Sequence, residues 1–130
     1  MKNLPGAADL LLIARDTLLT ELRSLAGDDA KYVLAMIANA MAIAAREAQS
    51  GDAPEIAALA RLHALHGAPA RELHGPALVD ALRAHERRLA ADIRAGRYDA
   101  DDERHGALLD HLRQSVAAKL RISNPKSLEP

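Results

Sequence analysis

Apolar residues recur every three or four positions through most of the chain, which is the spacing of one face of an α-helix. The first such stripe is Leu11, Ala14, Leu18, Leu22 and Leu25. Gly27 follows it and predicts a left-handed helix stop, because glycine adopts that conformation without a steric penalty. The pattern therefore predicts a first amphipathic helix that ends just before residue 27.

The segment from about Asp29 to Gln49 has a different pattern, because it is apolar on almost every side between Tyr32 and Ala45. A helix without a polar face is normally buried. We therefore expect a buried, Ala-rich second helix, either at the centre of the fold or at an interface between copies. Three side chains that end in polar groups share one face of this helix: Tyr32, Asn39 and Arg46. This face is our candidate surface for a partner or ligand. The alternative, which we favour, is that Asn39 is buried and makes a hydrogen bond between helices that fixes their packing.

Three further helices are expected after residue 51. Asp52 and Glu55 resemble a capping box with Pro54 in the first turn, and the helix that they begin extends to about Leu65. A loop follows from His66 to Gly75. A fourth helix, from Pro76 to Gly96, carries the stripe Leu78, Leu82, Leu89 and Ile93, and a fifth carries Leu109, Leu112, Val116 and Leu120 before Asn124 and Pro125 stop it.

These elements predict an all-α fold: a single-domain bundle of about five helices over residues 1–122, followed by a C-terminal tail at 123–130. The composition agrees, because Ala and Leu favour helices and the chain has no Phe or Trp and only two Tyr. No stretch is long and apolar enough for a membrane span or a signal peptide, so we expect a cytoplasmic protein that does not enter the membrane.

Charge and residue types exclude several function classes. Seventeen Lys and Arg balance eighteen Asp and Glu, so no basic surface for nucleic acid is expected. The chain has no Cys, its glycines are scattered, and no Gly-x-Ser-x-Gly motif is present, so it lacks the residues for thiolate chemistry, a phosphate-binding loop and a nucleophile elbow. We therefore expect no catalytic residues and no cofactor.

Histidines are the remaining candidates for chemistry. His63 and His66 are three residues apart and within reach of one metal ion, although at a helix end they can also contact terminal carbonyls. His85 and His105 are expected to be hydrogen-bonded residues at the edge of the core. Asp102 and His105 imitate the Glu-x-x-His pair of di-iron bundles, but Asp102 stands where a helix cap belongs.

Three segments carry a family resemblance: MIANAMAIAARE from Met36 to Glu47, IRAGRYD from Ile93 to Asp99, and LRISNP from Leu120 to Pro125. In these segments the chain resembles a functionally uncharacterised bacterial all-helical family. Its members tend to be encoded beside aminoglycoside-phosphotransferase-like kinases and acyl-CoA dehydrogenases. The resemblance implies a metabolic context and supplies no catalytic residues.

Three functions follow as hypotheses. The first is a non-catalytic helical accessory or interaction domain, a possible homodimer, that associates with such a kinase or dehydrogenase in hydroxy-acid or acyl-CoA catabolism. The second is a small metal- or ligand-binding enzyme that uses His63 and His66 with His74 or His85. The third is a DNA-binding regulator, based on the short turn before Asp28, although acidic residues at the start of the would-be recognition helix would repel phosphate.

Overall fold

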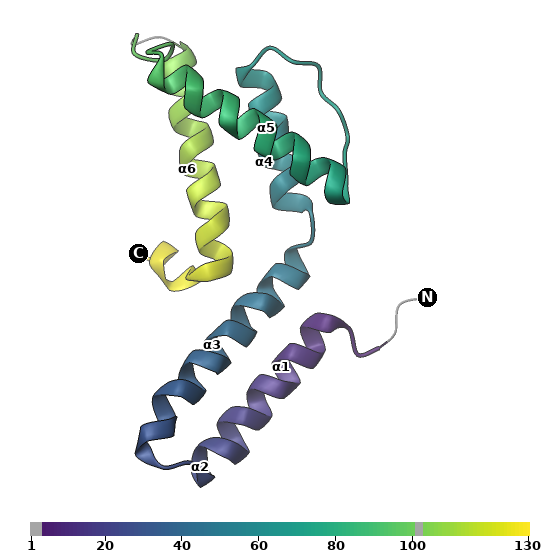
Figure 1. Ribbon diagram of the computed structural model, residues 1–130, viewed down its shortest axis with the longest axis vertical. Helices are drawn as coiled ribbons and strands as arrows, with labels where there is room; N and C mark the ends of the chain where they lie inside the picture. Colours follow the sequence, from purple (N-terminus) through teal and green to yellow (C-terminus); the bar gives the residue numbers. More distant parts are fainter. Residues whose placement is uncertain (1–3, 101–102) are drawn as a thin grey trace. The chain divides into compact units, whose positions relative to one another are not determined.

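The computed structural model of the chain describes residues 4–100 and 103–130, and in these residues every regular element is helical (Figure 1). The elements are α1 (Ala7–Thr17), a π turn η1 (Leu18–Leu22), α2 (Arg23–Leu25), α3 (Asp28–Ser50), α4 (Ala53–Leu65), α5 (Gly75–Arg94), α6 (Glu103–Ser123) and a 3-10 turn η2 (Pro125–Leu128). Because α1, η1 and α2 follow one another without a break, the described residues form five long helices. The predicted all-α class is confirmed. Asp102, for which we predict a capping role, lies outside the described residues.

The chain divides into two compact units, Met1–Gly51 and Asp52–Pro130. The first contains α1 to α3 and the second contains α4 to η2. In the second unit, η2 packs against α6, so part of the predicted tail is a helical turn. No helix in the described residues combines the length and the apolar character that crossing a bilayer requires.

Unit 1 is a hairpin in which α1 and α3 lie side by side (Figure 1). Ala38 and Ala45 of α3 are buried, as is Leu18 of η1. The small Ala side chains allow the two helix backbones to approach closely. The expected burial of the second helix is met at Ala38 and Ala45 but not on the other side of the helix. There Tyr32 is 73% exposed and Met36 is 55% exposed, because a hairpin supplies only one partner helix and covers only one side of α3.

The junction between the helices of unit 1 differs from the pattern in two ways. Gly27 is not a left-handed stop: its φ is −66° and its ψ is 168°, and it is the extended N-cap residue of α3. The apolar stripe of the first helix is also not buried beyond Leu18, since Leu22 and Leu25 are 48% and 82% exposed. The π turn at Leu18–Leu22 explains this, because its wider turn rotates the following residues away from the face that a 3.6-residue period predicts.

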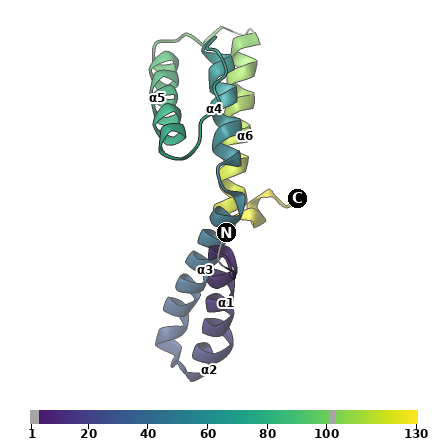
Figure 2. The same ribbon diagram turned by 90° about the vertical axis from the view of Figure 1, so that its right-hand side faces the viewer.

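Unit 2 is organised around α4, which packs against both α5 and α6 (Figure 2). Its core cluster contains Leu62 of α4, Leu89 of α5, Leu108 of α6 and Tyr98 from the α5–α6 connection. Leu59 and Leu78 are also buried. The predicted helix from residue 53 to Leu65 and the loop to residue 75 are confirmed.

Two details of the α4–α5 region correct or confirm the sequence pattern. Asp52 is the N-cap residue of α4 but makes no side-chain cap; its carboxylate instead accepts a hydrogen bond from the backbone N–H of Gly75 at 3.0 Å. The glycine stop of α5 is confirmed, because Gly96 has a φ of 73°. The apolar stripe of α5 is not buried at its last predicted position: Ile93 is exposed, whereas the neighbouring Asp92 is buried.

The predicted inner face of α6 is wrong by about one position. Leu109, Leu112 and Val116 are 38%, 40% and 56% exposed, whereas Leu108 and His111 are buried. Apolar residues at 108 and 109 give two possible stripes one residue apart. The stripe that faces inward contains His111, which is not apolar, so the apolar pattern does not mark that stripe as the buried face.

Candidate functional site

The predicted partner face of α3 lies at the surface of unit 1. Tyr32 and Asn39 are exposed and Arg46 is partly buried. The prediction that Asn39 is buried is therefore wrong. The interhelical hydrogen bond within the chain, which requires a buried Asn39, is wrong as well. The periodicity misled here because α3 is apolar on all sides, so the pattern could not say which side meets α1.

A contiguous apolar surface lies on the same side of α3. It consists of Tyr32, Val33, Met36 and Ile37, which are 73%, 53%, 55% and 40% exposed and are hereafter called the α3 patch. Tyr32 is four residues from Met36, Val33 is four residues from Ile37, and Val33 is three residues from Met36, so the four side chains are linked as neighbours on the helix surface. No charged residue occurs from position 32 to position 45. Contiguous apolar surface of this kind marks a contact site more often than a site of chemistry.

The histidines form a second feature, in unit 2, where the rings of three of them meet between α4 and α5. The Nδ1 atoms of His66 and His85 are 2.8 Å apart, and their rings are stacked with centroids at 5.1 Å. The ring of His63 meets that of His85 edge-on at 4.8 Å. The side-chain partners of His63 and His66 are thus other imidazoles rather than terminal carbonyls. The hydrogen-bonded role expected for His85 is confirmed.

The proton positions in the His66–His85 pair follow from burial. The Nε2 atom of His66 is buried and has no hydrogen-bond partner. A buried N–H without an acceptor costs roughly 1–3 kcal/mol, and orphaned donors are rarer in proteins than under-used acceptors. We therefore assign the proton of His66 to Nδ1, which donates to Nδ1 of His85.

A fourth histidine joins α4 to α6. Arg61 of α4 donates from Nε to Nδ1 of His111 at 3.4 Å and from a terminal nitrogen to the amide oxygen of Gln114 at 3.2 Å. His111 is only 5% exposed. Because its Nδ1 accepts a hydrogen bond, the ring is neutral and carries its proton on Nε2.

Burial sets the charge state of these rings. It lowers the pKa of His66 from the usual value, with Arg88 and then His85 adding to the effect. Burial also lowers the pKa of His85 and, together with the nearby Arg61, that of His111. The three imidazoles are therefore neutral at neutral pH.

A bound metal ion needs several ligand atoms that converge on one point. Among residues 4–100 and 103–130, no group of three His, Asp or Glu side chains is arranged to hold an ion. His74 lies apart from the other candidates, exposed at the start of α5 and 3.6 Å from Glu72. His105 donates a hydrogen bond from Nδ1 to the backbone carbonyl oxygen of Tyr98 at 2.7 Å, as expected for a residue at the core edge.

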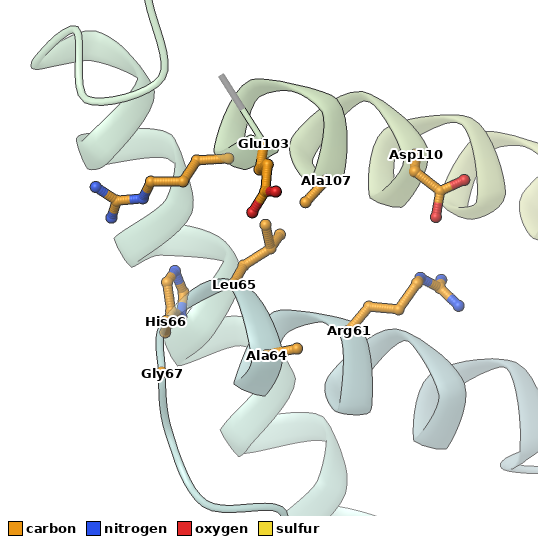
Figure 3. A pocket seen from close by; sticks show the side chains of 9 residues that line it. Arg61, Ala64, Leu65, His66, Gly67, Glu103, Ala107 and Asp110 are labelled. Carbon is orange, nitrogen blue, oxygen red and sulfur yellow. The ribbon is translucent and has the colours of Figure 1, made fainter. Parts of the chain in front are cut away.

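A cleft of ≈ 620 Å³ lies between the end of α4 and the first turns of α6 (Figure 3). Arg61, His66, Glu103 and Asp110 line it together with apolar atoms. Its polar groups are largely bonded within unit 2: Arg61 binds Gln114, which in turn donates to the carboxylate of Asp110 at 2.6 Å. Charges of both signs and these internal bonds leave no convergent set aimed at a ligand of one class.

One comparison with known proteins decides the family. The family described as a domain of unknown function, DUF6285, matches residues 23–127. The chain belongs to the DUF6285 family. The match takes in α3 to α6, and thus both the α3 patch and the four clustered histidines, while α1 precedes it. The expectation of an uncharacterised helical family is thereby confirmed in its coarse form.

No curated protein and no solved structure matches this DUF6285 chain. Its candidate functions therefore depend on its own residues. Sequence reasoning missed His111 and Arg61, which the fold brings together across α4 and α6. The signal for His111 was its place three residues after Leu108 and four before Ser115, on the inward side of α6.

Proposed function

We propose that the chain is a non-catalytic helical accessory domain that works as a homodimer, with the α3 patch as the contact between copies. The observation that carries this proposal is the exposure of four large apolar side chains in one place on a charge-free stretch of helix. Exposed apolar surface is stabilised when a partner removes it from water, by roughly 25 cal/mol for each Å².

A second copy fits the α3 patch better than a partner chosen by charge. In a two-fold dimer the same patch meets itself, so any charge within it would face a like charge. The stretch from Tyr32 to Ala45 has none. Ala35 and Ala40 are exposed beside the patch, and their small side chains permit a close approach of two α3 helices.

Unit 1 itself gives a second reason for a partner. Its buried apolar side chains among residues 4–51 are Leu18, Ala38 and Ala45. Two of these are alanines, which bury little area, so the hairpin gains little from its own core. Pairing two hairpins creates a bundle of four helices, in which apolar residues on more than one side of α3 are covered.

The proposed setting is an association with a small-molecule kinase of the aminoglycoside-phosphotransferase type or with an acyl-CoA dehydrogenase, in hydroxy-acid or acyl-CoA catabolism. The support for this part is the resemblance of the segments around Met36 to Glu47, Ile93 to Asp99 and Leu120 to Pro125. Affinity purification of the chain from its native host tests it. Recovery of either enzyme supports the association, and repeated purification without both contradicts it.

Light scattering during size-exclusion chromatography tests the homodimer. The unaltered chain should elute with twice its chain mass of 13.9 kDa. Met36→Glu should reduce the mass to that of one chain, because a carboxylate buried at the contact would face its own copy. Val116→Glu is the matched control, since Val116 of α6 is 56% exposed against 55% for Met36. A monomer for the unaltered chain, or equal effects of the two variants, would contradict the proposal.

A further inference from the structure

On each side of α4, one polar contact with the neighbouring helix depends on an imidazole nitrogen without a proton. Between α4 and α5, the Nδ1 atoms of His66 and His85 face each other at 2.8 Å, so only one of them can carry a proton. Between α4 and α6, Nδ1 of His111 accepts from Nε of Arg61. Protonation of the accepting nitrogen in either contact removes the lone pair that makes the bond.

We propose that this histidine junction is a proton-operated latch, which holds α4 against α5 and α6 while its imidazoles are neutral and releases them in mild acid. The latch is separate from the proposed dimer contact, because all of its residues lie in unit 2 and the α3 patch lies in unit 1.

The charged groups around the pair of His66 and His85 come from all three helices. Arg88 of α5 acts on both rings and opposes their protonation. His63 of α4 opposes it at His85, and His111 of α6 opposes it at His66. Asp92 of α5 favours protonation of His66. Asp92 is itself engaged, at 3.0 Å from Arg97 and 3.8 Å from Arg88, so its charge is partly balanced.

The groups around His111 are similarly mixed. Arg61 of α4 opposes its protonation, whereas Glu86 of α5 and Asp110 of α6 favour it. Burial is the largest influence at His111, as it is at His66 and His85, and it disfavours the charged ring at all three positions.

Acid adds a proton to the accepting nitrogen of each contact. An added proton on His85 Nδ1 sets two N–H groups against each other at the position of the present hydrogen bond. An added proton on His111 Nδ1 sets an imidazolium against the Arg61 guanidinium. In both cases movement of α4 away from its neighbour relieves the repulsion and hydrates the added charge, so the open form takes up protons more readily than the closed form. Leu62 and Tyr98, in the core beside the junction, become exposed in that form.

The two tyrosines of the chain allow a direct test in the full-length protein. Tyr98 is 4% exposed in the core of unit 2, and Tyr32 is the other tyrosine. In a Tyr32→Phe background, which keeps the α3 patch apolar, Tyr98 is the only emitter, since the chain has no Trp. Acrylamide quenching of its fluorescence then reports the opening of unit 2.

We expect the quenching constant of Tyr98 to rise several-fold as the pH falls from 7.5 to about 5, with the rise setting in below the ordinary histidine pKa of 6.5. In the same background, His85→Asn with His111→Gln should flatten this rise, because both amides accept hydrogen bonds and neither titrates in this range. His74→Gln is the control and should keep the full rise, because His74 is exposed outside the junction.

Tyr98 that stays protected at about pH 5, or a double variant that follows the unaltered curve, overturns the latch. If the double variant is already unfolded at pH 7.5, the proton uptake of the chain with all six histidines decides. The pH dependence of its urea unfolding should then correspond to uptake of more than one proton between pH 7 and about 5, and uptake below one overturns the proposal.

Discussion

Asp52 and Gly75 join the start of α4 to the start of α5, because the carboxylate of Asp52 accepts a hydrogen bond from the backbone N–H of Gly75 at 3.0 Å. Asp52 precedes α4 and Gly75 begins α5, so one hydrogen bond sets where the second helix starts relative to the first. The residues between α4 and α5 include no other regular element.

Asp52→Ala should therefore destabilise unit 2 by about 1 kcal/mol, the usual net value of one hydrogen bond. Asp52→Asn should cost less, because its amide oxygen still accepts. Urea unfolding followed by circular dichroism measures both values. Equal stabilities for Asp52→Ala and the unaltered protein would show that the bond contributes nothing.

Gly96 and Gly106 should respond in opposite directions to substitution by alanine. Gly96 has a φ of 73°, and a Cβ atom there would lie 2.8 Å from a carboxylate oxygen of Asp99. Gly96→Ala should therefore cost about 1–2 kcal/mol, since left-handed backbone penalises any Cβ. Gly106 lies within α6 with nothing within 4 Å of its would-be Cβ, so Gly106→Ala should stabilise by about 0.5–1 kcal/mol. Thermal unfolding compares them, and a stabilising Gly96→Ala would be the contrary result.

Asn39→Leu tests the new placement of Asn39 at the surface. Leucine is a better helix former than asparagine by a few tenths of a kcal/mol, and Asn39 is exposed near the α3 patch. We expect the melting temperature to be unchanged or slightly raised and the dimer to persist. A drop in melting temperature would instead mean that the amide makes a stabilising bond, and loss of partner binding without unfolding would indicate a recognition role.

The histidine titrations can be measured one by one. Burial lowers the folded-state pKa of His66, His85 and His111 from 6.5. The unfolded chain consequently binds more protons below pH 6.5, so this part of the stability is present above 6.5 and is lost as the pH falls through the folded-state values. NMR titration of the ring Hε1 protons should place three of the six histidines below 6.5. Ordinary or raised values for His111 would contradict the assigned contact with Arg61.

The helices themselves could be predicted from the sequence, because Ala and Leu favour helices and Gly, Pro and Asn mark their ends. The bounds of α4 and the glycine stop at Gly96 followed from such signals. The side on which each helix packs was harder to predict. α3 has no polar face to mark the outside, and in α6 the adjacent Leu108 and Leu109 offered two stripes, of which the buried one contains His111.

For the same reason, the sequence could predict only part of the candidate site. His63 and His66 are close in sequence, so their proximity could be expected from helix geometry. His85, His111 and Arg61 come from three helices, and no local pattern records which of their faces meet. The π turn at Leu18–Leu22 likewise has no marker in the period of the stripe that it interrupts.

The pairing of two α3 helices is tested most directly by a cysteine scan, since the chain has no natural Cys. Single cysteines at positions 33, 36, 37 and 40 are compared with Val116→Cys as the exposed reference on α6. Under mild oxidation, at least one position on α3 should form a disulfide-linked dimer much faster than position 116, because two-fold pairing brings identical residues near the axis. Cross-linking no faster on α3 than at position 116 would contradict a dimer formed through the α3 patch.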